Sequence, residues 1–183
     1  GLGGTGDSSL RETGLVAPAE THAFVQGALV ERNPLDVVVL PIEPPQGRRN
    51  LPLAMLRSEF AEGLVRLRYS PLALAYVDQR VVDASYTPLT MSEGADFRIL
   101  LRHWDDSMWR SRGRIDVRAE VHMLDPQAPK GTPLWGGPIQ TTLTINPRRD
   151  NFTTDAQMIE AACQQFVEQV LAHLPPRRPE AGS

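Results

Sequence analysis

Cysteine is almost absent from this sequence, because Cys163 is the only one among 183 residues. A single thiol excludes a disulfide within the chain and any metal site that needs several thiolates. Long apolar runs are also missing, and no stretch approaches the roughly 20 apolar residues of a membrane-spanning helix. The net charge is only −3 and the pI about 5.8, which argues against a dedicated nucleic-acid-binding protein.

The motifs of several enzyme classes are absent as well. The glycines at the start of the chain, Gly1, Gly3 and Gly6, have GxGxxG spacing but precede no predicted strand, and the chain has no Walker-type phosphate-binding loop and no GxSxG nucleophile elbow. Its histidines show neither HxH nor HExxH spacing. We therefore expect no nucleotide, no metal and no other cofactor.

Composition divides the chain into a central domain and two tails. Residues 1–20 are glycine-rich and lack apolar periodicity, which predicts a flexible N-terminal tether. Residues 21–174 carry the apolar patterns of one domain, and we expect residues 175–183 to form a disordered tail. No signal-peptide pattern is present, so we expect either a cytosolic protein or the mature form of an exported one.

A strand, a helix and a second strand are predicted in the first half of the domain. The β-branched run at 35–42 is typical of a strand buried on both faces. Apolar residues then recur every three or four positions, which predicts an amphipathic helix over about 52–68 with Arg57 among its polar residues. Residues 72–77 are interpreted as a second strand, and we expect 78–94 to be irregular.

The second half predicts an antiparallel meander and a closing helix. Strands are expected at 97–104, 114–124 and 134–145, and the middle one alternates polar and apolar residues without a break. Such alternation gives one buried and one solvated face, which favours antiparallel pairing. The glycines before Pro138 predict a β-bulge, and an amphipathic helix is predicted over about 154–173.

This order of elements predicts an α+β fold. We expect a two-layer sandwich with a mixed sheet, built from a βαβ start, an antiparallel meander and a closing C-terminal helix. Both helices are expected to cover the same face of the sheet.

The most unusual segment is the turn HWDDSMWRSRGR at residues 103–114, which combines two tryptophans and a methionine with carboxylates and arginines. Large apolar side chains are costly to expose, so they either fold back onto the core or form a surface for a partner or ligand. The Asp pair alone offers too few ligands for a cation site. The candidate interaction surface comprises Trp104, Asp105, Asp106, Met108, Trp109, Arg110 and Arg112.

Arginines on the predicted meander form a second candidate site. Arg98 and Arg102 are expected to face acidic residues of the next strand, and a ladder of cross-strand ion pairs is the interpretation that we favour. The alternative is an anion-binding surface. Its candidate residues are Arg98, Arg102, Arg114 and Arg118.

Two histidines and the single cysteine receive less specific interpretations. His103 shares the parity of the apolar residues on its strand, whereas His122 lies among polar residues, so we expect the two on opposite faces. That placement argues against a metal site between them. Cys163 falls on the apolar stripe of the last helix and is expected to be a buried, unreactive thiol.

Several short motifs together resemble a known group of proteins. Val37–Pro41 is a strand ending in proline, Gly94-Ala95-Asp96 introduces a hydrophobic strand, and Gly131–Trp135 matches a G-x-x-LW return strand. Over about residues 35–173 the chain resembles small bacterial envelope lipoproteins, whose domains are similar to the N-terminal domain of TolB, to LpoB and to the periplasmic domain of CsgG. The resemblance implies an exported domain tethered through a lipidated cysteine, although the sequence shown contains no lipobox cysteine.

The resemblance also implies a function. It points to a non-catalytic periplasmic lipoprotein domain, anchored to the outer membrane, that acts by protein–protein contact in cell-envelope assembly or maintenance. Its expected partners are envelope proteins, with self-association as a further option. Membrane contact would occur only through the lipid anchor, and no nucleic-acid partner is expected.

Two alternatives stay open at this point. One is a small-ligand or anion-binding domain that uses the arginine-rich face, and the other is a small enzyme that uses His103 or His122 with Asp105 or Asp106. A partner-binding domain predicts exposed tryptophans, a ligand-binding domain predicts arginines around a hollow, and an enzyme predicts a contact between a histidine and a carboxylate.

Overall fold

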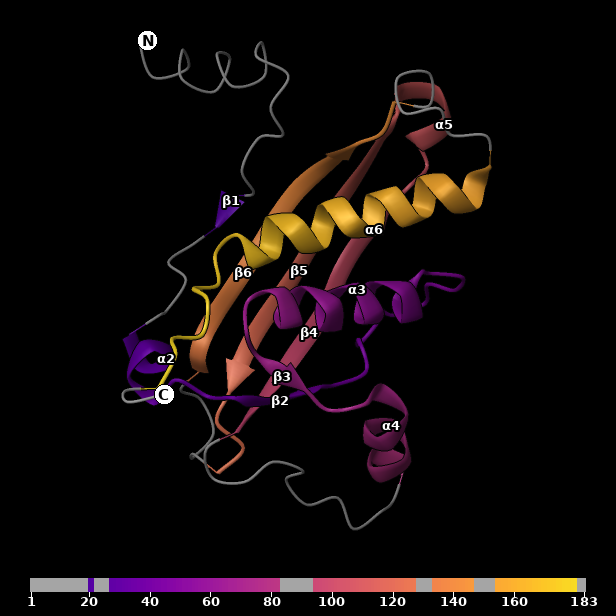
Figure 1. The fold of residues 1–183 in the computed structure, drawn as a ribbon. Helices are drawn as coiled ribbons and strands as arrows, with labels where there is room; N and C mark the ends of the chain where they lie inside the picture. The colour runs from indigo at the N-terminus through magenta and orange to yellow at the C-terminus, as the bar shows by residue number, and fades with distance from the viewer. Residues whose placement is uncertain (1–19, 22–26, 83–93, 128–132, 147–153, 181–183) are drawn as a thin grey trace, which may run out of the picture.

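The computed structural model describes residues 20–21, 27–82, 94–127, 133–146 and 154–180 (Figure 1). Six strands form one sheet, and five helices accompany it within these residues. The elements are β1 Glu20–Thr21, α2 Gly27–Arg32, β2 Asp36–Val39, α3 Leu53–Arg66, β3 Ser70–Pro71, α4 Leu74–Val82, β4 Ala95–Asp105, α5 Trp109–Arg112, β5 Arg114–Leu124, β6 Pro133–Thr144 and α6 Asp155–Leu171.

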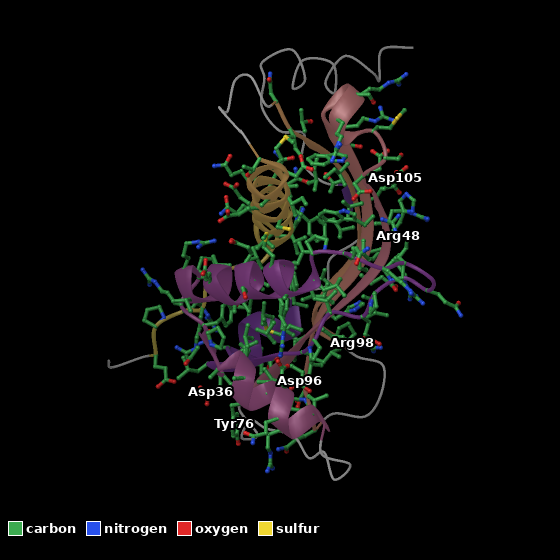
Figure 2. The ribbon with its side chains drawn as sticks, turned by 90° about the vertical axis from the view of Figure 1, so that its right-hand side faces the viewer. Asp36, Arg48, Tyr76, Asp96, Arg98 and Asp105 are labelled. Atoms are coloured by element: carbon green, nitrogen blue, oxygen red, sulfur yellow. The ribbon has the colours of Figure 1, made fainter. Side chains whose placement is uncertain are left out.

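The sheet is mixed and has the strand order β1-β6-β5-β4-β2-β3. β2 runs parallel to both β3 and β4, whereas β4, β5, β6 and β1 pair in antiparallel fashion. Helices α3 and α6 lie side by side over one face of the sheet (Figures 1 and 2). The predicted α+β two-layer sandwich is therefore confirmed, including both helices on one face.

The alternation of β5 sets the two faces of the sheet. Its inward residues, from Ile115 to Met123, are at most 2% exposed, and its other residues face away from the helices. We call this second side the outer face, and the residues of β4, β5 and β6 that lie on it are polar for the most part. Among the described residues, no helix covers the outer face of these three strands (Figure 2).

Aromatic rings fill the layer between the sheet and the two helices. Phe60 of α3 lies 5.4 Å from Phe97 of β4 and 6.1 Å from Phe166 of α6, measured between ring centroids. Trp135 stacks on Phe97 at 6.1 Å, and its indole N–H donates to the backbone oxygen of His173 at 2.9 Å. These contacts join both helices to the centre of the sheet.

β-Bulges occur in two places that differ from the expected one. The glycines 136–137 keep regular register with β5, so the bulge predicted there is wrong. The register shifts instead at Leu134. Its neighbours Trp135 and Pro133 pair with Met123 and Leu124 of β5, whereas Leu134 has no partner on that strand. A second bulge interrupts β4 between Leu101 and His103, which the sequence pattern did not reveal.

Residues 72–77 are not a strand. The second strand, β3, is only Ser70–Pro71, and α4 begins at Leu74. Proline lacks the N–H that a longer ladder needs, and Leu74, Val77 and Val81 have the spacing of one helix face. Val77 is fully buried, and α4 packs against β2. Helix α4 ends at Val82, and the rest of the segment expected to be irregular, residues 83–93, lies outside the described residues.

The end of the chain also differs from expectation. The capping box predicted for α6 is present, with Thr154 and Gln157 bonded reciprocally at 3.2 Å. The expectation of a disordered tail is wrong for residues 175–180. The hydroxyl of Tyr69 donates to Pro175, and the side-chain amide of Asn33 both accepts from and donates to the Arg178 backbone at 3.1 and 3.0 Å.

Planar side chains complete the sheet where strands are missing. Beyond β3, the Nε and Nη2 atoms of Arg57 donate to the backbone oxygen of Val39 at 3.1 and 2.8 Å, while Nη1 pairs with Asp78 at 2.5 Å. At the opposite edge, the amide of Gln165 accepts from the Thr144 N–H at 2.8 Å and donates to its carbonyl at 3.1 Å. Arg57 is therefore a buried residue with a structural role, although its helical position predicted a solvated one.

We expect Arg57→Met to lower the free energy of unfolding by about 2–4 kcal/mol, because it leaves the buried Val39 carbonyl without a donor. Asp78→Asn is the matched control. It removes only the ion pair with a half-exposed carboxylate and should cost less than about 1 kcal/mol. Urea unfolding followed by circular dichroism measures both, and equal losses would contradict this role of Arg57.

Candidate functional site on the outer face of the sheet

Trp104 belongs to the core and not to a binding surface. It is 2% exposed, and its ring meets that of Phe166 edge-on with 6.5 Å between centroids. The bulge after Leu101 turns it inward, because both Leu101 and Trp104 are buried on the helix side. Its inclusion in the candidate interaction surface is therefore wrong.

The other apolar residues of that turn are partly accessible. Met108 and Trp109 are half-buried, and Trp109 packs against the core from α5. The Arg110 guanidinium lies 5.3 Å from the centroid of the Trp109 ring and pairs with Asp155 at 2.6 Å. Arg112, on the same short helix, is exposed. These four residues lie on or just before α5 at one end of the molecule, and we call them the α5 surface.

The two aspartates of the turn are held by local contacts. Asp105 accepts from the backbone and hydroxyl of Ser107 at 3.0 and 2.6 Å, and these hydrogen bonds lower the pKa of its carboxyl below the ordinary value. Asp106 pairs with Arg48 at 3.7 Å, from the loop after β2. Figure 2 shows Arg48, Arg98 and Asp105 on the side of the sheet turned away from α3 and α6.

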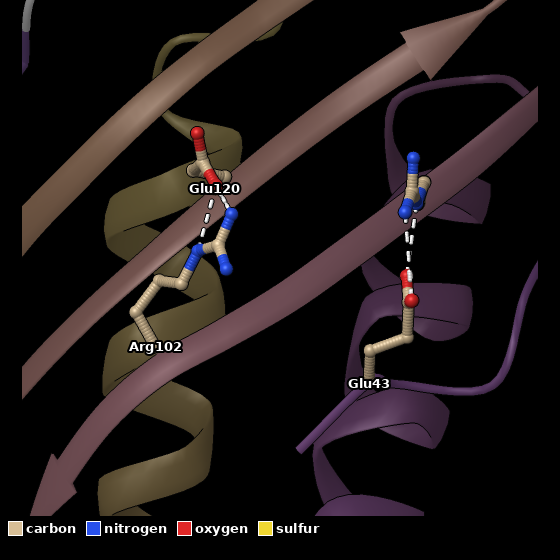
Figure 3. A network of polar contacts seen from close by, with 4 residues as sticks. Glu43, Arg102 and Glu120 are labelled. Atoms are coloured by element: carbon tan, nitrogen blue, oxygen red, sulfur yellow. Dashed lines mark hydrogen bonds and ion pairs between the residues drawn. The ribbon is translucent and has the colours of Figure 1, made fainter. Parts of the chain in front are cut away.

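Three of the four arginines of the second candidate site are held in ion pairs. Arg98 donates to Glu43 at 2.8 and 3.4 Å, Arg102 donates to Glu120, and Arg114 lies 3.7 Å from Asp116. Figure 3 shows the first two pairs in front of the sheet, with the helices behind it. The predicted cross-strand ladder is confirmed for Arg102. Glu43 was missed, because it belongs to a segment that joins β4 in parallel after β2 has ended.

Arg118 differs from the other three. It is exposed, and it makes no ion pair or side-chain hydrogen bond with the residues that the structure describes. It lines an open hollow of about 590 Å³ on the outer face, together with Arg102, Glu120, Gln140 and the strand segments beside them. The sequence did not single out Gln140, although its parity on β6 places it on the outer face.

The two histidines share a face but remain far apart along the strands. His122 pairs with Arg98, whereas His103 pairs with Arg118, four rows further along. The bulge in β4 shifts the parity of His103, so the expectation of opposite faces is wrong. Within the described residues, neither histidine hydrogen-bonds to a carboxylate, and no group of three or more metal-ligating side chains is found.

Cys163 lies in the core, as predicted. Its side chain is fully buried on α6, and burial, followed by the charges of Glu59 and Glu160, raises the pKa of the thiol to about 12. A thiol that stays protonated at neutral pH is a poor nucleophile.

A partly buried carboxyl lies near the other end of the sheet. Asp96 pairs in register with the fully buried Val38, and its buried Oδ1 atom has no hydrogen-bond partner among the residues that the structure describes. Burial and then the charge of Asp125 raise the pKa of Asp96 from 3.8 to about 6. Asp125 itself is held by Arg32, which also donates to the Gly94 carbonyl at 2.9 Å.

Comparisons with known proteins identify the fold. No protein-family model and no curated protein matches the sequence. Among solved structures, the PelC dodecamer from Paraburkholderia phytofirmans matches with a TM-score of 0.50 and 12% identity, over 85% of this chain and 97% of that one. Lipoprotein GNA1162 from Neisseria meningitidis matches with a TM-score of 0.45 and 15% identity, over 73% and 96%.

The similarity to PelC shows a shared fold and nothing finer at this identity. A similarity to TolB, LpoB or CsgG stays a prediction. The described helices include none that is both long and apolar enough to cross a bilayer.

The raised pKa of Asp96 predicts a pH-dependent stability. Between pH 3.8 and about 6, this carboxyl is protonated in the folded protein but ionised in the unfolded chain. The stability that comes from the bound proton is therefore present at low pH and is lost as the pH rises through 6. Asp96→Asn should therefore stabilise the protein at pH 7.5, by about 1–2 kcal/mol after allowance for partial exposure.

This gain should shrink as the pH falls from 6 towards 3.8, and it should vanish below pH 3.8, where the wild-type carboxyl is protonated in both states. Thermal unfolding at a series of pH values measures the difference between variant and wild type, and the exposed carboxyl of Asp106, changed to Asn, is the control. A gain that does not vary with pH would contradict the assignment.

Proposed function

We propose that this chain is a non-catalytic lipoprotein domain of the bacterial envelope, located in the periplasm, that works by protein–protein contact as a subunit of an oligomeric assembly. Its envelope partners would bind an assembled form of the protein. The lipid anchor would be attached on the N-terminal side of this domain.

The observation that carries this proposal is the fold shared with PelC, whose solved structure is a dodecamer. The match covers 97% of the PelC chain and 85% of this one, so the similarity extends over most of the domain. A shared fold alone does not determine function. The step from shared fold to shared mode of action is supported by the surface features of this chain and by its sequence resemblance to envelope lipoproteins.

The α5 surface is the part best suited to protein contact. It combines a half-buried tryptophan, a methionine and arginines, which are residue types enriched at protein interfaces. It lies at one end of the long β4–β5 hairpin, away from α2 (Figure 1). An end surface of this kind can contact a neighbour without disturbing the packed layer between sheet and helices.

We expect the purified chain to form an oligomer whose mass is a multiple of 20.2 kDa. Size-exclusion chromatography with light scattering measures this mass over a range of protein concentrations. Arg112→Glu reverses a charge on the α5 surface and should shift the distribution towards monomers, because like charges at an interface oppose association.

Arg80→Glu makes the same change at an exposed position on α4 and serves as the control. A chain that remains monomeric at every concentration would contradict the proposed assembly, and equal effects of both variants would contradict the use of the α5 surface. Fractionation of cells that produce the full-length precursor tests the location, which a purely cytosolic protein would overturn.

A further inference from the structure

The bulge in β4 crowds cationic and polar side chains at one point of the outer face. Leu101 pairs with Ala119 and His103 with Arg118, so Arg102 and His103 together oppose Arg118. A bulge places two residues of one strand opposite a single residue of its neighbour, and bulges are common beside functional sites. On its other side, Arg118 pairs with Gln140 of β6.

The two carboxylates that flank Arg118 on β5 are already engaged. Glu120 accepts from Arg102, with one of the two contacts at 2.8 Å. Asp116 accepts from the Thr142 hydroxyl at 2.7 Å and lies near Arg114. The outer-face carboxylates before and after Arg118 on its own strand are thus held by other groups, and the Arg118 guanidinium keeps its donors for a ligand.

The hollow supplies the space for that ligand. Its volume of about 590 Å³ falls within the range of small-molecule sites. Its charged lining residues are Arg102, Arg118 and Glu120, which leaves one net positive charge. Gln140 adds an amide that both donates and accepts, and Pro138 adds an apolar rim.

We propose that this hollow binds a small carboxylate whose body carries hydroxyl groups, with Arg118 as the binding residue for the carboxylate. The planar guanidinium matches a carboxylate with two parallel N–H···O bonds. Arg102 remains paired with Glu120 and adds positive charge beside the ligand, and the Gln140 amide bonds to a neighbouring hydroxyl. This site is independent of the proposed assembly, because it lies on the middle of the sheet and not on the α5 surface.

The test uses glucuronate as the probe, with glucose as its neutral counterpart and glucose 6-phosphate as a phosphate-bearing one. Titrations followed by amide NMR shifts give the affinity and locate the site. We expect saturable shifts on β4, β5 and β6 with glucuronate that weaken as salt is added, and none with glucose. Equal binding of glucose, tighter binding of the phosphate, or no shifts at tens of millimolar glucuronate would each overturn the proposal.

Three variants determine which residues carry the binding. Arg118→Gln should weaken glucuronate binding by about tenfold or more, because it removes a charge-assisted pair of hydrogen bonds. Glu120→Gln should strengthen it severalfold, because it frees Arg102 and raises the local charge. Arg66→Gln, on the helix layer behind the sheet, makes the same charge change as the first variant and should have no effect.

These positions are exposed or half-exposed, and circular dichroism verifies that each variant is folded. Unchanged binding by Arg118→Gln would overturn the assignment, as would weaker binding by Glu120→Gln. Since the mass measurement and the titration have separate readouts, failure of the proposed assembly leaves this test intact.

Discussion

The structure depends on one requirement, which is that every buried backbone N–H and C=O of the sheet finds a partner. The sheet has a very short strand at each edge, β3 with two residues and β1 with two residues. Such strands cannot satisfy the longer strands beside them. The chain meets the shortfall with side chains that imitate a strand: the Arg57 fork at Val39 and the Gln165 amide at Thr144. Both come from the helices α3 and α6, so the two layers are joined by hydrogen bonds as well as by aromatic packing.

The sequence predicted those parts of the fold that follow from a repeating pattern. The unbroken alternation of β5 and the apolar stripes of α3 and α6 identified the layers and their orientation correctly, because burial of apolar surface dominates both. Residues 72–77 were misread because the run Leu-Ala-Leu-Ala-Tyr-Val suits a strand and a helix alike, and only the short reach of β3 decides between them. Arg57 was misjudged for a related reason, since a pattern of polarity does not reveal a buried carbonyl in need of a donor.

At the candidate site, the sequence pattern was a poorer guide to which side chains face the core. A single extra residue in β4 moved Trp104 into the core and His103 onto the outer face. Parity arguments fail beyond such a point, since the side-chain period of a strand is two and a shift of one reverses every later residue. The arginines were recognised from sequence as a group, but their partners come from β5 and from the segment after β2. Only the three-dimensional pairing shows that Arg98, Arg102 and Arg114 are held in ion pairs, and that no described residue holds Arg118 in the same way.

The docking of residues 175–180 has a practical consequence for handling this protein. The Tyr69 hydroxyl and the Asn33 amide bind the backbone of Pro175 and Arg178, so this last described segment lies beside α2, at the end of the domain remote from α5 (Figure 1). A fluorescent protein or affinity tag joined there would project away from both the α5 surface and the middle of the outer face. Attachment chemistry at this end can therefore immobilise the molecule on a sensor chip while its two candidate contact regions stay open to solution.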